Sequence, residues 1–110
     1  MSRLDPSKAI LNFHAPPYDT KLDQAFVDGK RVHVGSRAVR DLINEYRPLL
    51  GLHGHIHESW ATDKVGGTVV VNPGSEAYEG ILRFSIVMVE RQLKGIVVNY
   101  KVKSAIVLTG

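Results

Sequence analysis

A helix-forming pattern between two short apolar runs constrains the fold more than any other feature of this sequence. Ser36 is a suitable N-cap, and Pro48 ends the pattern. The apolar positions between them have the i, i+3, i+4, i+7 spacing of an amphipathic helix: Val39, Leu42, Ile43 and Tyr46. The runs on either side, residues 9–13 and 49–52, are predicted to be short buried strands. A strand, a helix and a second strand in this order indicate a βαβ-like unit with a partly parallel sheet.

The segment between the first predicted strand and the helix is predicted to be a long loop. Pro16 and Pro17 end the strand because proline cannot donate a hydrogen bond to a neighbouring strand. Residues 18–35 show no convincing hydrophobic period. Loops of this length inside a compact domain are commonly functional or disordered, so this loop is the candidate specificity segment.

The second half of the chain is predicted to consist of hairpin strands. A Gly-Gly pair precedes the β-branched residues 68–71, and an Asn-Pro-Gly-Ser turn follows them. Residues 81–90 are predicted to form a long strand. Residues 96–103 alternate between apolar and mostly polar side chains, which is typical of a strand with one buried face. No linker or repeat divides the chain, so residues 1–110 are expected to form a single α/β domain.

The composition fits a globular protein, with 44% hydrophobic and 23% charged residues. The 14 basic and 11 acidic residues give a net charge of +3, which suits an anionic substrate but is also common in proteins without one. The chain has no cysteine, which excludes disulfides and thiolate metal sites. It has no apolar run near the roughly 18 residues needed to cross a bilayer. We therefore expect a cytoplasmic protein without a membrane partner.

Three of the five histidines fall within five residues, at His53, His55 and His57. In an extended chain, side chains at i and i+2 share a face, with Cα atoms about 6.6–6.8 Å apart. Imidazole nitrogens bind divalent metals, so His55 and His57 could bind one metal or two neighbouring metals. A single zinc bound by all three histidines fits the spacing equally well, and the spacing does not decide between these arrangements.

His14 directly follows the first predicted strand, whereas His55 follows the strand at residues 49–52. Ligands of α/β sheets gather beyond the carboxyl ends of the strands. If the two strands are parallel neighbours, His14 and His55 emerge at the same edge and can converge. A lone histidine at a strand end is more often a hydrogen-bonding loop residue than a metal ligand, so the expectation depends on the pair.

Three motifs together resemble the second half of calcineurin-like metallophosphoesterases, and most closely the small prokaryotic members. They are His14-Ala15-Pro16-Pro17, Gly54-His55-Ile56-His57 and Asn72-Pro73-Gly74-Ser75, and the resemblance covers residues 10–89. The Gly-His-x-His motif is the most specific of the three. The resemblance implies a C-terminal half of the family's four-layer α-β-β-α sandwich, with a mixed sheet and C-terminal hairpin strands.

The resemblance also implies roles for individual residues. His14 and His55 match ligands of one metal, and His57 matches a ligand of a second. The two metals are expected to be manganese, iron or zinc. Together they would activate a hydroxide that hydrolyses a phosphate mono- or diester, with nucleic acid one possible substrate. His33 is a candidate for substrate binding, although a surface histidine is the more common interpretation.

The family's remaining motifs are absent from this sequence. It has no Asp-x-His, no Gly-Asp for a bridging carboxylate, and no Gly-Asn-His for the catalytic histidine, so no catalytic residue is assigned. Two dications without a bridging carboxylate repel each other strongly. The chain is therefore expected to be inactive unless a complementary N-terminal half, or a second copy in a homo-oligomer, completes the site. The alternative is a non-catalytic metal-binding or interaction module with one zinc on His53, His55 and His57.

Overall fold

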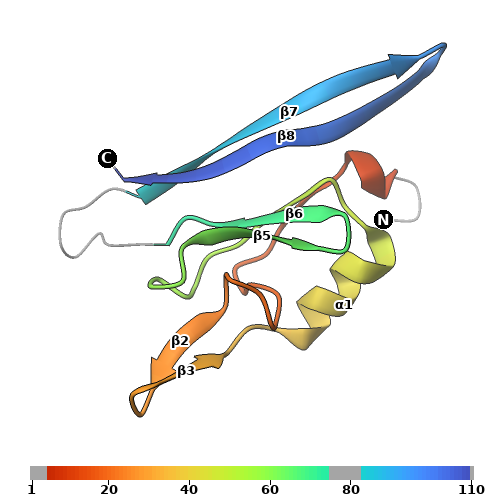
Figure 1. Ribbon diagram of the computed structural model, residues 1–110. Coiled ribbons are helices and arrows are strands. Elements are labelled where there is room, and N and C mark those ends of the chain that lie inside the picture. The colour runs from red at the N-terminus through yellow and green to blue at the C-terminus, as the bar shows by residue number, and fades with distance from the viewer. Residues whose placement is uncertain (1–4, 75–82, 110) are drawn as a thin grey trace.

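A four-stranded mixed sheet forms the centre of the computed structural model, which describes residues 5–74 and 83–109 (Figure 1). The strand order is β1-β4-β6-β5. The bounds are β1 (Ile10–Asn12), β4 (Leu50–Leu52), β5 (Ala61–Val65) and β6 (Thr68–Asn72). β1 and β6 both pair parallel to β4, whereas β5 pairs antiparallel to β6. The predicted partly parallel sheet is confirmed.

The predicted helix is α1 (Arg37–Tyr46). The side chain of Ser36 accepts a hydrogen bond from the N–H of Val39 and so caps the first turn. The helix ends at Arg47, which is left-handed with φ of 48°. Ile43 on the apolar stripe is fully buried. The core between α1 and the sheet is formed by Leu22, Ile43, Val65 and Val70, with Leu11, Val39 and Ala61 packed against it.

Residues 18–35 contain a β-hairpin, so the prediction of a loop without strands was wrong. β2 (Gln24–Val27) pairs antiparallel with β3 (Lys30–His33). Asp28 and Gly29 connect them with φ of 50° and 76°. Asp-Gly is a preferred two-residue hairpin turn because both positions take a positive φ. The signal was present in the sequence, but the two strands have only four residues each, too few to show a convincing hydrophobic period.

A second hairpin forms the C-terminal part of the described chain. β7 (Arg83–Lys94) and β8 (Val97–Thr109) pair antiparallel along their whole length, with a register shift between Met88 and Val89. Both strands run further than predicted: β7 continues past residue 90, and β8 continues past residue 103. The first two residues of the predicted strand 81–90 lie outside the described residues.

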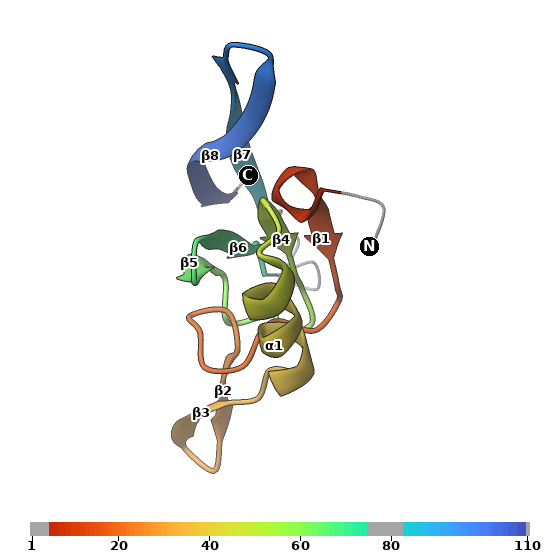
Figure 2. The same cartoon turned by 90° about the vertical axis from the view of Figure 1, so that its right-hand side faces the viewer.

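Figures 1 and 2 show α1 and the β2–β3 hairpin on one side of the central sheet and the β7–β8 hairpin on the other. The fold is therefore mixed α/β with a mixed sheet and C-terminal hairpin strands. The predicted four-layer sandwich is not confirmed, because α1 is the one α-helix in residues 5–74 and 83–109. A short 3₁₀ turn, η1 (Pro6–Lys8), precedes β1. No helix in the described part of the chain is long and apolar enough to cross a membrane.

Candidate metal centre

His14 and His55 meet just beyond the carboxyl ends of β1 and β4. Strand-like pairing continues past both ends, because Phe13 N–H donates to the carbonyl of Leu52 at 3.2 Å and Gly54 N–H donates to the carbonyl of His14 at 2.9 Å. His14 Nε2 lies 3.0 Å from His55 Nδ1, and the two rings are nearly perpendicular, with centroids 4.8 Å apart. The predicted convergence of these two histidines at one edge of the sheet is confirmed.

The backbone at His55 adopts a conformation that side chains rarely take. Its φ is 67°, in the left-handed region, and the N–H of Ile56 closes a tight turn onto the carbonyl of Gly54 at 2.8 Å. Non-glycine residues in this region are uncommon and cluster at functional sites. The turn directs the chain out of the sheet and places the exposed His55 ring beside His14.

His57 lies on the same loop, is exposed, and has no recorded contact with the His14–His55 pair. Asn72, the last residue of β6, is fully buried and holds this loop in place. The amide nitrogen of Asn72 donates to the carbonyls of Ile56, Ser59 and Leu22 at 2.9, 3.0 and 3.2 Å. The predicted Asn-Pro-Gly-Ser turn therefore begins with a residue that holds the histidine loop in place. Ser75, the last residue of that turn, lies outside the described residues.

Gly74 allows the turn after β6 to lie directly against the histidine loop. Its N–H donates to Asn72 Oδ1 at 2.9 Å. Its φ is 73°, and a Cβ at this position would stand 2.7 Å from the carbonyl oxygen of His57 and 2.8 Å from Cβ of Trp60. A side chain at position 74 would therefore displace the loop that carries His57.

The His14–His55 pair has the spacing expected of two ligands on one metal. Imidazole nitrogens bind zinc at about 2.0–2.1 Å, so two neighbouring ligands of one ion stand about 3 Å apart. His14 Nε2 and His55 Nδ1 meet this condition at 3.0 Å. Among the described residues, however, no group of three His, Asp or Glu side chains lies close enough to bind one metal. The pair fits part of a metal centre, and a complete centre needs further ligands.

His53 is a buried histidine beneath the site, with 6% of its surface exposed. Its Nδ1 lies 3.1 Å from the carbonyl oxygen of Ala15, which can only accept, so Nδ1 carries the hydrogen. Nε2 is buried without a hydrogen-bond partner and lies against Gly51, where a Cβ would be 2.5 Å away. Burial is the main cause of a lowered pKa for His53, which favours the neutral ring, although the carbonyls of Ala15 and Phe13 act in the opposite direction.

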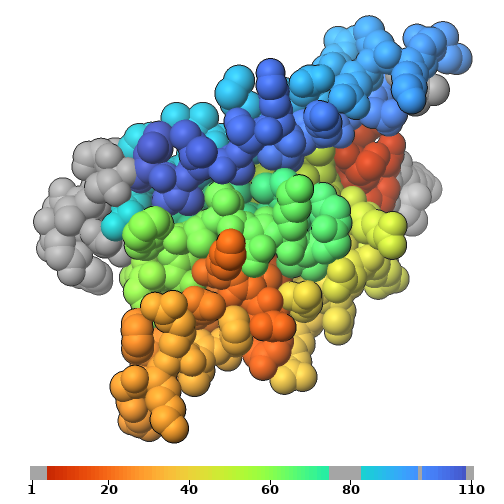
Figure 3. Space-filling view, viewed as in Figure 1, coloured from red at the N-terminus to blue at the C-terminus, as the bar shows by residue number. Residues whose placement is uncertain are grey.

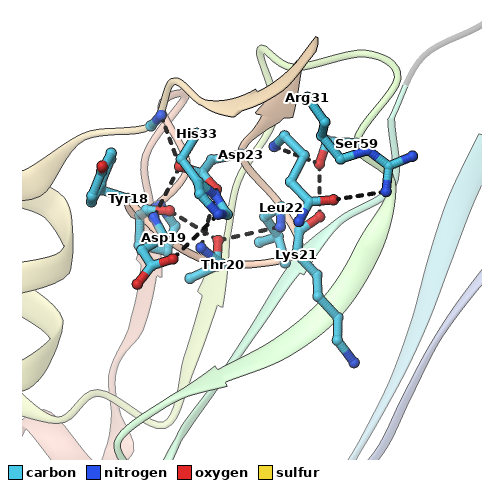
Figure 4. A network of polar contacts seen from close by, with 12 residues as sticks. Tyr18, Asp19, Thr20, Lys21, Leu22, Asp23, Arg31, His33 and Ser59 are labelled. Atoms are coloured by element: carbon cyan, nitrogen blue, oxygen red, sulfur yellow. Dashed lines mark hydrogen bonds and ion pairs between the residues drawn. The ribbon is translucent and has the colours of Figure 1, made fainter. Parts of the chain in front are cut away.

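His33 lies in a separate polar network on the β2–β3 hairpin (Figure 4). Its Nδ1 is 2.6 Å from Asp23 Oδ1, and its Nε2 is 3.2 Å from Asp19 Oδ1. Asp23 is fully buried, and its carboxylate also accepts hydrogen bonds from three backbone N–H groups, those of Asp19, Thr20 and Gly35. The two nitrogens of the predicted substrate-binding residue are thus already engaged. Sequence reasoning missed the role of Asp23, because its partners come together only when the hairpin folds.

The chain belongs to the metallophosphoesterases of the calcineurin superfamily, since residues 1–95 match the model of that family. An uncharacterized protein of Methanocaldococcus jannaschii is 45% identical over 67 residues, which are 59% of this chain and 30% of the relative. The matched part of the chain thus spans less than a third of that relative's length. No solved structure matches the chain. The resemblance first seen in the histidine and Asn-Pro-Gly motifs is confirmed at the level of the family.

Proposed function

We propose that this chain contributes part of the metal centre of a phosphoesterase that hydrolyses phosphate mono- or diesters. His14 and His55 would bind one divalent transition metal, and His57 would bind a second. Manganese, iron or zinc suits imidazole ligands. When bound, such metals supply Lewis acidity toward the phosphoryl oxygens and lower the pKa of water toward neutrality. Family membership supports this class of reaction, and the histidine geometry supports the assignment of ligands.

The observation that carries the proposal is the 3.0 Å contact between His14 Nε2 and His55 Nδ1. Two parallel strands bring these atoms together from positions 41 residues apart in the chain. Two neutral imidazoles can also share one hydrogen bond at this distance. Both rings are exposed at the carboxyl edge of a parallel sheet, where α/β proteins bind ligands. A hydrogen bond that only stabilises the fold can form anywhere in the protein. A metal centre that acts on a substrate must be exposed, as these two rings are.

The residues of this chain contribute by holding nitrogens in place. The tight turn at Gly54 and His55 fixes the direction of one ring, and the extended pairing of Phe13 with Leu52 fixes the start of the segment that bears the other. Neutral imidazole leaves a bound dication strongly Lewis acidic, since it adds no negative charge. One nitrogen of the present contact carries a hydrogen, so for both rings to bind one metal that ring must carry its hydrogen on the other nitrogen instead.

The remaining part of the proposed centre comes from outside this sequence. A bridging carboxylate and a catalytic histidine are needed, and the motifs that supply them in the family are absent here. We propose that a complementary N-terminal segment, or another subunit, adds them and completes the four-layer sandwich. The unpaired outer edge of β1 is available for an added strand, because β1 is at the end of the sheet and Ile10 is 56% exposed.

Metal binding to the isolated chain tests this proposal. Isothermal titration with Zn²⁺ and Mn²⁺, with elemental analysis after dialysis, would be compared between wild type, His14→Ala, His55→Ala and His57→Ala. We expect weak binding that falls at least tenfold when either His14 or His55 is replaced. His33→Gln removes a histidine from the separate polar network and serves as the matched control, with binding expected to match wild type.

A different pattern would reject the assignment. Tight binding of one zinc that survives His14→Ala but is lost in His53→Ala would favour the three-histidine module instead. The geometry gives that module little support: His53 is in the core with Nδ1 bonded to Ala15, whereas His55 is exposed and pairs with His14.

A further inference from the structure

A groove on the side of β5 combines exposed aromatic rings with basic side chains. It consists of two adjoining pockets that share Lys21, and we refer to them together as the aromatic–basic groove. The first pocket is bounded by the β2–β3 hairpin and the loop before β5. The second lies between β5 and β8. Figure 3 shows the orange β2–β3 hairpin beside the light green loop that follows β4.

The aromatic pocket has a volume of about 220 Å³ and is lined by Gln24, Phe26, Arg31, Glu58, Ser59 and Trp60, besides Lys21. Its two rings are largely exposed, Phe26 at 64% and Trp60 at 46%. This volume is below the roughly 300–1,000 Å³ of pockets that enclose a whole drug-sized ligand. It is suited to a flat ring inserted at its edge.

Each exposed ring has a guanidinium group over it. Arg31 is 5.3 Å from the centroid of Phe26, its direct partner across the hairpin, and Arg83 is 4.3 Å from the centroid of Trp60. Guanidinium planes and aromatic faces both stack on nucleobases, and the guanidinium groups add positive charge next to the stacking surface. Both rings and Arg31 line the same pocket, whereas Arg83 contacts Trp60 from outside the pocket lining.

The basic pocket has a volume of about 360 Å³ and carries three exposed lysines, Lys21, Lys64 and Lys103. Asp63 is the acidic residue of its lining, and its carboxylate already accepts hydrogen bonds from the backbone N–H groups of Lys21 and Lys64 at 3.0 and 2.8 Å. Among the described residues, none of the three ammonium groups forms an ion pair within 4.0 Å. The lysines are thus available to an external anion.

Lys21 connects the two pockets. Its carbonyl accepts a hydrogen bond from Ser59 Oγ at 2.7 Å, which ties it to the aromatic pocket. Figure 4 shows its side chain extending away from Ser59 and Arg31. A ligand that follows the groove therefore meets stacking surfaces at one end and ammonium groups at the other.

We propose that the aromatic–basic groove binds single-stranded nucleic acid, with phosphates along Lys21, Lys64 and Lys103 and bases stacked at Phe26 and Trp60. Proteins that bind single strands combine such a basic track with aromatic platforms. The lysines would also attract an acidic membrane surface. Lipid headgroups, however, have no flat rings to stack on Phe26 and Trp60 in the aromatic pocket. A duplex is excluded from stacking, because its bases are already paired and stacked.

The inference goes beyond the proposed hydrolysis and does not depend on bound metal. Glu58, Ser59 and Trp60 lie on the loop that carries His55 and His57, so the groove adjoins the candidate metal centre along the chain. Oligonucleotide binding can be measured with a chelator present. A result that rejects the nucleic-acid groove is therefore distinguishable from one that rejects the metal centre.

Fluorescence anisotropy of the full chain with labelled oligothymidylate and oligouridylate of about 12 nucleotides tests the proposal, with chelator present throughout. We expect Phe26→Ala and Trp60→Ala each to weaken binding about tenfold. Neutralising the three groove lysines with glutamine should reduce the slope of log K against log salt by about 2, since each phosphate contact on a single strand contributes about 0.7.

Matched controls separate the groove from general attraction. Tyr46→Ala removes a partly exposed aromatic ring on α1, and a triple glutamine variant removes the same charge elsewhere, at Lys8, Lys94 and Lys101. Both should bind within twofold of wild type. Circular dichroism verifies that each variant folds, and Phe26→Ala is the decisive variant because that ring is mostly in solvent.

Three results would overturn the proposal. The first is no oligonucleotide binding by wild type at about 50 mM salt. The second is equal loss of affinity in the two triple-lysine variants, which would mean attraction by net charge alone. The third is tighter binding to phosphatidylserine vesicles or to duplex DNA than to the single strands, with no effect of Phe26→Ala.

Discussion

Two histidine clusters in this protein differ in how completely their ring nitrogens are partnered. His33 has a carboxylate oxygen within 3.2 Å of each nitrogen, from Asp23 and Asp19. His14 and His55 share a single contact, and their other ring nitrogens have no hydrogen-bonding protein partner among the described residues. We call the cluster of His33, Asp23 and Asp19 the closed cluster, because both ring nitrogens have protein partners, and we call His14 and His55 the open pair. The open pair leaves nitrogen atoms at an exposed sheet edge, as a ligand site requires.

The difference follows from what each cluster has to stabilise. Asp23 is fully buried, and a buried carboxylate is costly unless several donors surround it. Three backbone N–H groups and the His33 ring meet that requirement. The His14–His55 pair is exposed, so water can replace any contact that the protein does not supply. A histidine whose two ring nitrogens both have protein partners is therefore interpreted as structural. An exposed histidine with a ring nitrogen that lacks a protein partner is a candidate ligand.

The largest expected effect is on the closed cluster. Asp23→Ala leaves three backbone N–H groups without their acceptor, so we expect the free energy of unfolding to fall by about 3 kcal/mol or more. Urea denaturation followed by circular dichroism measures the change. Asp41→Ala, on the exposed side of α1, is the matched control and should stay within about 0.5 kcal/mol of wild type. A small effect of Asp23→Ala would show that the cluster is not closed in solution.

Added metal is expected to act on the open pair alone. Zinc at 100 times its dissociation constant should stabilise wild type by about 2.7 kcal/mol, if it binds the folded chain and not the unfolded chain. Thermal unfolding with and without zinc measures this shift. His14→Ala and His55→Ala should lose the shift, whereas His33→Gln should keep it. An equal shift in all four proteins would mean that zinc binds elsewhere, and the comparison between the clusters would fail.

The buried His53 gives a third test, in metal-free protein with chelator present. Burial lowers the folded-state pKa of His53, so the unfolded chain binds more protons in the window below the ordinary value of about 6.5. Stability is therefore complete above this window and falls as the pH drops through it, by at most about 1.4 kcal/mol per pH unit. Denaturation between about pH 5 and 7 should show this slope in wild type and a smaller slope in His53→Leu. Equal slopes would contradict the burial of the ring.

The smallest expected effect is on the metal-free stability of the open pair. His14→Ala removes an exposed side chain with one ring contact, so the free energy of unfolding should change by less than about 0.5 kcal/mol. The same denaturation experiment measures it. A loss above about 1.5 kcal/mol would show that the contact between the two rings is structural, and the contrast with Asp23 would disappear.

Much of the scaffold was predictable from local patterns. The apolar stripe from Val39 to Tyr46 predicted α1, and its cap at Ser36 was identified from the residue type. The two short apolar runs around it predicted parallel strands and so the meeting of His14 with His55. The β2–β3 hairpin was missed although its Asp-Gly turn was visible. With that hairpin predicted, the pairing of Phe26 with Arg31 would have followed from the register.

The sequence by itself determined the family, the helix and the two strands that bring His14 and His55 together, because these depend on short motifs and local hydrophobic periods. The tertiary structure decided which other histidines share a site. The position of His57 depends on a turn at Gly54 and His55 that ends the period-2 alternation, and on Asn72, whose three carbonyl partners are 13 to 50 residues away. The burial of His53 and the closure of the Asp23 cluster likewise arise from contacts between distant segments. A spacing rule cannot include those contacts, since their energy exists only after the chain has packed.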